Sequence, residues 1–373
     1  MNERAPNAID FWRGYALVCI FVNHVPGIRF EHLTLRDFSI SDSAELFVFL
    51  AGWALRLGQD RRLRSRPPGT GMTKSWKRAL ELHVAHLSAS LCALAILIAA
   101  ATFLDAPSVL TWMHAGEFFD RPAGAVAGMM LLTYQLQFFD ILPLYVVFML
   151  AAPLMLRIDA ISPKLLLVLS VALYLAASAA RVNFPLRPGS GTWFFNPLTW
   201  QLDFVLGYLV ASRARFGPAA ARLSAKLWWP ALGIVCIAAI CAALRLVPDP
   251  TVSTGSVQAY LFSKTFFGPA RLVQFAALAV VVAPVFPLIV RFAPKMANLG
   301  SLLGRNSLPV FWIGSSLSLL GQIVRFSAGS SISTDLGIVL AGIPVLIATA
   351  RISEWTKKRD AVASRQALSY SSV

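Results

Sequence analysis

The stretch "DFWRGYALVCIFVNHVPG", from Asp10 to Gly27, decides the fold class because it has the length and the apolar character of a membrane helix. A spanning α-helix needs about 20 predominantly apolar residues. This stretch nevertheless carries an aspartate, an arginine and a histidine. Ionisable side chains inside a membrane are costly, and where they occur they usually mark a functional site. We therefore expect a membrane helix that contributes to such a site.

The composition indicates that the rest of the chain resembles this stretch. Of its 373 residues 57% are hydrophobic and only 14% are charged, and the mean hydropathy is +0.65. A soluble domain contains about 25% charged residues, so the chain is expected to be a polytopic membrane protein. The net charge of +15 does not indicate nucleic acid as a partner, because the basic residues gather in the connections between apolar runs.

The apolar runs predict an all-α bundle of ten transmembrane helices. The connection between Arg56 and Arg78 contains eight basic residues and is expected to stay in the cytoplasm. Alternation from that loop places both termini in the cytoplasm. We expect one transmembrane domain over 1–356 and a basic cytoplasmic tail over 357–373, whose last dozen residues fray. The expected spans are 9–28, 42–57, 79–104, 138–157, 163–182, 197–212, 227–246, 271–291, 307–325 and 335–354.

Two connections leave alternatives open. Residues 122–137 are either a loop or a short interfacial helix, and residues 247–270 either form a loop or dip into the outer face of the membrane. A bundle of eight or twelve spans would leave the termini on the same side.

Three ionisable residues of the first span form the first part of a candidate site. Arg13 and His24 are eleven positions apart, so at 100° per residue they lie on one helix face, about 16 Å apart along the axis. Asp10 precedes Arg13 by three residues, a spacing at which the two side chains can pair. This topology places Asp10 and Arg13 near the cytoplasmic end and His24 near the outer end.

Two carboxylates at the start of the second span form the second part. Asp42 and Glu45 share a helix face and are expected at the depth of His24. A histidine beside a carboxylate is a general-base arrangement, because the carboxylate fixes the ring tautomer and stabilises the imidazolium. The alternative is structural: residues near span ends often extend to water, and Asp10 with Arg13 would then only fix the topology.

Further polar residues at span ends are weaker candidates. His83 and His86 begin the third span at a spacing of three residues, but without a clear third ligand we expect no metal site. We expect instead that His86 binds the donor or that these histidines only satisfy the helix end. Asp140 and Asp203 each enter a span alone, where a helix-start role is as plausible as a catalytic one.

Motifs in the expected order along nearly the whole chain resemble the OpgC family, whose members modify osmoregulated periplasmic glucans and which is a branch of the acyltransferase 3 superfamily. The first span followed by "SDSAELFVFLAGW" looks like the start of that family. The later motifs are "DILPLYVVFMLAAPLML", "FNPLTWQLDFVLGYL", "KTFFGPARLVQFAALA" and "LGRNSLPVFW". In the wider superfamily an arginine and a histidine separated by ten residues mark the first span, and the histidine is regarded as catalytic. Arg13 and His24 match that pattern.

The sequence departs from the superfamily in two places. Ala51 stands where serine is usual in the second span, and the segment "LGRNSLPVFWIG" ends in Gly314 where the superfamily often continues to a second histidine. Any role of that histidine does not carry over to this chain.

The resemblance implies acyl transfer, most simply of a succinyl group, from cytoplasmic acyl-CoA to hydroxyls of a periplasmic glucan. His24 would be the general base, oriented by Glu45 or Asp42, while Arg13, paired with Asp10, would steady the donor. An acyl-His24 intermediate is an alternative route. No permanently bound cofactor is expected; succinyl-CoA is the donor substrate. The expected partners are the lipid bilayer of the bacterial inner membrane, the glucan and proteins of glucan biosynthesis. The predicted substrate-binding residues are His86, Arg62, Arg64, Lys264, Arg271 and Asn306.

A different class of function remains open at this point. Intramembrane acids, histidines and arginines also serve proton relays, and a bundle of this size suits alternating access. The alternative is therefore a multi-span transporter or a proton-coupled glycan exporter. The absence of a visible repeat between the two halves of the sequence counts against it.

Overall fold

The computed structural model describes residues 5–63, 70–213, 218–248 and 256–370. The fold is all-α: 80% of the chain is helical, and in the described part extended backbone pairs only at an isolated bridge between Pro185 and Thr192. Contacts divide the chain into two compact units. We call residues 31–284 the central unit and residues 1–30 with 285–373 the terminal unit.

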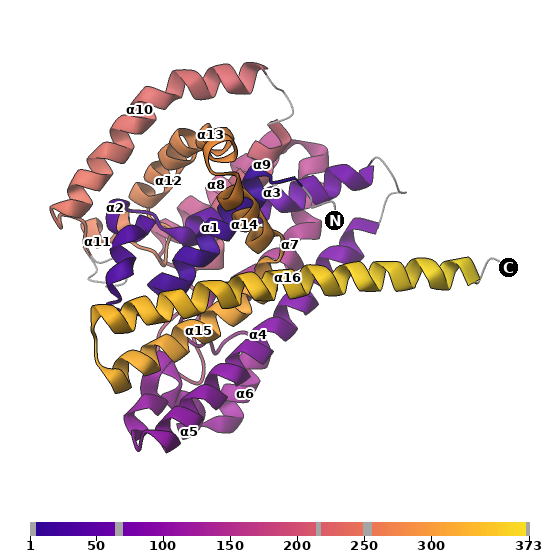
Figure 1. The fold of residues 1–373 in the computed structure, drawn as a ribbon. Helices are drawn as coiled ribbons and strands as arrows, with labels where there is room; N and C mark the ends of the chain where they lie inside the picture. The colour runs from indigo at the N-terminus through magenta and orange to yellow at the C-terminus, as the bar shows by residue number, and fades with distance from the viewer. Residues whose placement is uncertain (1–4, 64–69, 214–217, 249–255, 371–373) are drawn as a thin grey trace. The chain divides into compact units, whose positions relative to one another are not determined.

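The central unit is built from long helices that pack in pairs. α3 lies against α9, α4 against α7, α8 against α9, and α10 against α12 (Figure 1). The long helices are α3 (Ser43–Leu63), α4 (Thr70–Phe103), α7 (Ile141–Ile161), α8 (Pro163–Ala179), α9 (Pro197–Arg213), α10 (Pro218–Ala243) and α12 (Pro269–Val282). Short helices lie in the connections: α2 (Leu35–Phe38), α5 (Gly116–Asp120), α6 (Pro122–Met130) and α11 (Val257–Phe262).

Proline residues define the first turn of many of these helices. Proline suits this position because its fixed φ is helical and its missing N–H would have no partner inside the helix. At the start of α8, Ser162 is the N-cap, since its hydroxyl accepts a hydrogen bond from the backbone N–H of Leu165 at 3.4 Å. Prolines open α6, α8, α9, α10 and α12.

Two glycines allow α3 and α9 to touch through their backbones. A Cβ atom added to Gly52 would lie 1.9 Å from the carbonyl oxygen of Phe204, and one added to Gly207 would lie 2.0 Å from that of Phe49. Small residues are the usual means by which membrane helices approach closely. This contact fixes α9 beside the first turns of α3, where the candidate carboxylates lie.

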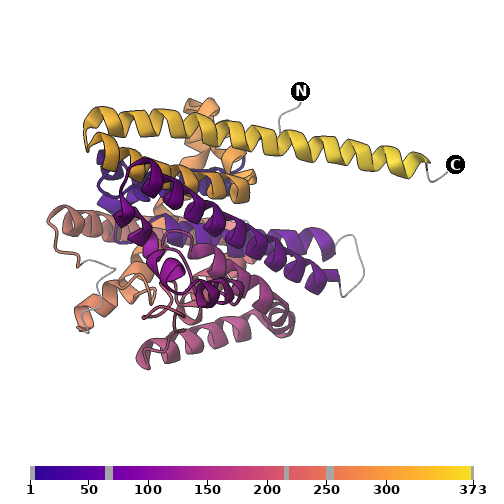
Figure 2. The ribbon, with the colours of Figure 1, turned by 90° about the horizontal axis from the view of Figure 1, so that it is seen from below.

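The terminal unit contains α1 (Ala8–Asn23), α13 (Val285–Phe292), α14 (Pro294–Arg305), α15 (Ser307–Ala328) and α16 (Ile332–Tyr370). α15 and α16 run side by side in both views (Figures 1 and 2). α1 packs on α14 at backbone distance, because a Cβ atom on Gly304 would lie 1.8 Å from the carbonyl oxygen of Asp10.

Each of the ten apolar runs coincides with a helix or, for 271–291, with the consecutive helices α12 and α13. The all-α prediction is confirmed. In the described part, five helices have the length and hydropathy of a membrane span, and six if α12 and α13 form one span. The other helices are either shorter than about 20 residues or less apolar, so ten spans and cytoplasmic termini stay predictions. The division at residue 356 also stays a prediction.

Three local features differ from the expectation. α1 ends at Asn23, five residues before the expected end, because Pro26 and Gly27 (φ 72°) follow. The connection before the ninth run folds into α14, which was not predicted. α16 continues to Tyr370, so residues 362–370 are helical where a frayed tail was expected. Of the two ambiguous connections, 122–137 contains α6 and 247–270 contains α11.

Candidate functional site

The first turn of α3 is held by a reciprocal cap between Asp42 and Glu45. Asp42 Oδ1 accepts the backbone N–H of Ala44 at 2.8 Å, and Glu45 Oε2 accepts the backbone N–H of Asp42 at 2.8 Å. This is the capping-box pattern, which satisfies N–H groups that have no partner within the helix. Both carboxylates therefore have a structural use, and each keeps an oxygen for another partner.

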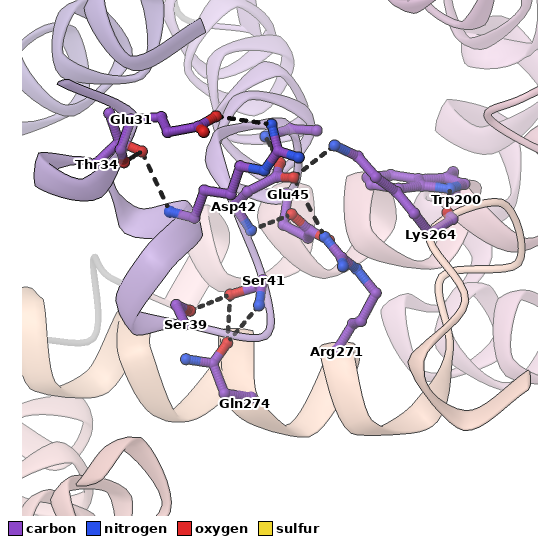
Figure 3. Close-up of polar contacts among 12 residues, drawn as sticks. Glu31, Thr34, Ser39, Ser41, Asp42, Glu45, Trp200, Lys264, Arg271 and Gln274 are labelled. Carbon is purple, nitrogen blue, oxygen red and sulfur yellow. Dashed lines mark hydrogen bonds and ion pairs between the residues drawn. The ribbon is translucent and has the colours of Figure 1, made fainter. Parts of the chain in front are cut away.

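Arg271 on α12 is the main partner of Glu45. Its Nε and Nη2 lie 2.6 Å and 2.5 Å from Glu45 Oε1, and its Nη2 lies 3.5 Å from Asp42 Oδ2 (Figure 3). Arg271 is 2% exposed and Glu45 is fully buried. A buried ion pair is tolerated when further hydrogen bonds satisfy its atoms, and here both oxygens of Glu45 are engaged.

Lys264 binds the second carboxylate from the segment between α11 and α12. Its Nζ lies 2.5 Å from Asp42 Oδ2. Trp200 of α9 holds the backbone of this lysine, because the indole N–H donates to the Lys264 carbonyl oxygen at 2.9 Å. The structure thus brings together four residues predicted from the sequence: Asp42, Glu45, Lys264 and Arg271, which we call the charge cluster.

Uncharged polar groups surround the charge cluster. Gln274 lies one turn after Arg271, and its Oε1 accepts from both the backbone N–H and the hydroxyl of Ser41. Gln274 was missed by the sequence analysis, although a polar residue three positions from Arg271 in an apolar run was a usable signal. The Gln274 Nε2 and the Ser43 hydroxyl are buried and have no hydrogen-bond partner among the described residues.

Two further carboxylates come close to the charge cluster. Asp140 precedes α7 and is 8% exposed; its side chain makes no cap hydrogen bond and its charge interacts with that of Lys264. Asp203 on α9 is fully buried, its charge interacts with that of Glu45, and neither of its oxygens has a hydrogen bond of normal geometry to a described residue. The structure therefore adds these two aspartates, which the sequence left as lone residues, to the surroundings of the site.

The residues predicted on the first span lie in the terminal unit. Asn7 caps α1 by accepting from the backbone N–H of Asp10, while its own amide donates to the Asp10 carboxylate. Arg13 is partly buried in the second turn of α1. His24 lies directly after the last helical residue, and its carbonyl oxygen accepts from Gln322 Nε2 of α15 at 2.6 Å. The pairing of Asp10 with Arg13 stays a prediction.

The orientation of His24 by Glu45 or Asp42 also stays a prediction, because these residues belong to different units. Within the central unit, Glu45 is already bound by Arg271 and Asp42 by Lys264.

The remaining predicted binding residues are dispersed. His86 is fully buried on α4, and neither ring nitrogen has a hydrogen-bond partner in the described chain. Asn306 joins α14 to α15: its Nδ2 donates to the Leu302 carbonyl oxygen at 3.0 Å, and its Oδ1 accepts from Lys357 at 2.8 Å. Arg64 and the side chain of Arg62 lie outside the described residues.

A polar cluster that the sequence analysis missed joins the C-terminal halves of three helices. Arg56 of α3 and Tyr208 of α9 both bind Asp159 Oδ2 of α7 at 2.8 Å. The guanidinium of Arg56 also lies over the Tyr208 ring, 5.1 Å from its centroid. Asp159 sits near the end of an apolar run, where the sequence pattern gave it no partner.

Over the described part of the chain, no group of three or more His, Cys, Asp or Glu side chains is placed to hold a metal ion. The chemistry available in the charge cluster is instead the binding of polar groups by paired charges and by buried hydrogen-bonding atoms.

Comparison with protein families gives one match, to the family described as OpgC protein, over residues 4–358. We found no match among curated proteins or among solved structures. The match covers nearly all of the sequence, including α1 with His24 and all four residues of the charge cluster. The chain therefore belongs to the OpgC family.

Proposed function

We propose that this protein is an inner-membrane O-acyltransferase that moves an acyl group, in the simplest case succinyl, from cytoplasmic acyl-CoA to hydroxyls of a periplasmic glucan. Membership of the OpgC family implies a role in the modification of osmoregulated periplasmic glucans, and the match over residues 4–358 is the observation that carries the proposal. Several helices with the length and hydropathy of membrane spans support the location of the protein in a membrane.

In the proposed reaction, His24 is the general base that takes the proton of the sugar hydroxyl. Its imidazole takes the proton of the sugar hydroxyl while the oxygen attacks the thioester carbonyl carbon. The C–S bond then breaks, the ester forms, and the imidazolium returns the proton to the departing thiolate of coenzyme A. His24 suits this role because a neutral imidazole accepts a proton near neutral pH, and because it ends α1 at a point where Gln322 fixes the backbone.

The donor side of the proposal uses basic residues. Arg13, eleven residues before His24 in the chain, would steady the anionic or thioester end of the donor. The connection that contains Arg62 and Arg64 would attract the phosphates of coenzyme A, because clustered positive charge raises the local concentration of anions. His86 would contact the donor inside the membrane, where its ring nitrogens have no described partner.

The buried carboxylate of Asp203 favours the alternative function, a transporter, which should be tested beside the first proposal. Asp203 is a fully buried carboxylate without a normal hydrogen bond in the described chain, and intramembrane carboxylates of this kind serve proton relays. A transporter would leave the glucan chemically unchanged, so the two functions predict different products.

Mass spectrometry of periplasmic glucans tests the proposal directly. Cells with the protein should contain glucans heavier by whole acyl units, while cells without it, or with His24→Ala at the same protein level, should lack this increment. His32→Ala is the matched control, because the side chain of His32 is exposed and pairs with the partly exposed Asp37. An unchanged glucan profile in cells without the protein would refute the assignment of glucan as the acceptor. Acylated glucans in the His24→Ala cells would refute the role of His24 as the general base.

A further inference from the structure

The charge cluster contains one buried ion pair and one that is partly exposed. The side chains of Arg271 and Glu45 are 2% and 0% exposed, while those of Lys264 and Asp42 are 17% and 18% exposed. A ligand that approaches the charge cluster from its exposed side therefore meets Asp42 and Lys264 first. Arg271 and Glu45 lie behind them, where Glu45 fixes the backbone N–H of Asp42.

The charges of the cluster do not suit an anionic ligand. Asp42 and Glu45 balance Lys264 and Arg271, and the nearby Asp140 and Asp203 add only acidic groups. The local charge is thus zero or negative. Sites for carboxylates and phosphates present an excess of positive charge, so neither the free carboxylate of a succinyl group nor the phosphates of coenzyme A match this cluster.

The hydrogen-bonding groups instead match a sugar with several hydroxyls. Asp42 accepts hydrogen bonds and Lys264 donates them. The hydroxyl of Ser43, next to Asp42 in the chain, and the Nε2 of Gln274 are buried without a partner among the described residues. Buried polar atoms are nearly always hydrogen-bonded, so such atoms beside a charge cluster fit a site that binds polar groups.

We propose that Asp42 and Lys264 form the subsite for the glucan acceptor, binding neighbouring hydroxyls of an uncharged sugar unit and rejecting sugar units that already carry an anionic substituent. The inference rests on the proposed function and adds to it the place where the acceptor binds and the kind of sugar unit that is accepted. In the bound state the Asp42 carboxylate accepts from one hydroxyl and the Lys264 ammonium donates to the next. A succinyl group attached in an earlier turnover brings a carboxylate that this site repels, so the acyl groups spread over the glucan.

Binding of glucan to the purified full-length protein, in the absence of any acyl donor, tests this inference. The probes are unsubstituted glucan from cells that lack the protein and the same glucan succinylated chemically. Unsubstituted glucan should bind about tenfold or more tightly than the succinylated form. Asp42→Asn and Lys264→Met should each weaken binding of unsubstituted glucan by about tenfold or more, because each removes a hydrogen bond to a charged group.

The two substitutions are chosen to keep the fold. Asparagine caps helices as well as aspartate does, so Asp42→Asn retains the start of α3. Lys264→Arg provides a second variant, which keeps the charge and should retain most of the binding. The matched controls are Asp105→Asn and Lys164→Met, which change exposed residues outside the cluster and should bind glucan like the unmodified protein.

Other outcomes overturn the inference. Equal binding of neutral and succinylated glucan would refute the preference for uncharged sugar units. Unchanged glucan binding by both Asp42→Asn and Lys264→Met would refute the assignment of these two residues to the acceptor subsite. Failure of the proposed function looks different: neutral glucan binds as described, but the protein transfers no acyl group from acyl-CoA.

Discussion

The ion pair between Arg271 and Glu45 allows a quantitative test of how the central unit is held together. Arg271→Met removes the ion pair and the Nε hydrogen bond to Glu45 Oε1 and leaves a fully buried carboxylate whose remaining hydrogen bond, among the described residues, comes from the Asp42 N–H. Loss of one partner of a buried pair costs about 3–5 kcal/mol of unfolding free energy. Against a typical total of 5–15 kcal/mol, this is a large fraction of the stability.

The assay is equilibrium unfolding in mixed micelles, followed by helical circular dichroism. Arg36→Met is the matched control: Arg36 pairs with Glu31 at 3.4 Å but is 58% exposed, and such surface pairs contribute at most about 1 kcal/mol. The double variant Arg271→Met with Glu45→Met removes the buried charge as well. The double variant should regain most of the lost unfolding free energy, except for about 1 kcal/mol from the lost hydrogen bond between the Asp42 N–H and Glu45.

Two results would refute this account of the ion pair. One is a loss below about 1 kcal/mol for Arg271→Met, which would mean that water or another group compensates Glu45. The other is a double variant no more stable than Arg271→Met alone, since the cost would then come from packing and not from an unpaired charge.

Two further predictions concern the rest of the fold. Gly304→Val should lower the yield of folded protein more than Gly337→Val, because a Cβ atom at position 304 would lie 1.8 Å from the Asp10 carbonyl oxygen while position 337 has open space. Size-exclusion chromatography in detergent measures the yield of folded protein. Equal yields for the two variants would contradict the packing of α1 on α14. Tyr208→Phe should reduce the unfolding free energy by about 1 kcal/mol through loss of its hydrogen bond to Asp159, and an unchanged unfolding curve would show that this bond contributes nothing.

The sequence predicted the helices well where hydropathy alone determines them. An apolar run of about 20 residues satisfies its backbone as a helix in lipid, and each of the ten runs is helical. α14 was not predicted from hydropathy because its sequence, "PKMANLGSLLGR", is amphipathic and shorter than a membrane span. Its stability comes from contact with α1, through glycines whose importance only the packing reveals.

The candidate site could be predicted only as separate pieces. Asp42 and Glu45 stood out because they open an otherwise apolar helix, and the family resemblance indicated the segments of Lys264 and Arg271. Their pairing joins residues more than 200 positions apart, a separation at which no local spacing rule applies. Asp203 and Asp140 likewise acquired significance only when the N-terminal ends of their helices were placed beside the charge cluster.

Transfer of a labelled acyl group by the purified protein would show directly whether the protein acylates a glucan. Purified protein in lipid nanodiscs is mixed with succinyl-CoA labelled in the succinyl group and with unsubstituted periplasmic glucan, and the label in the glucan is followed over time. The account predicts ester-linked label that accumulates with the unmodified protein and with His32→Ala but not with His24→Ala. Glucan that stays unlabelled while both substrates remain intact would contradict the account and favour a transporter.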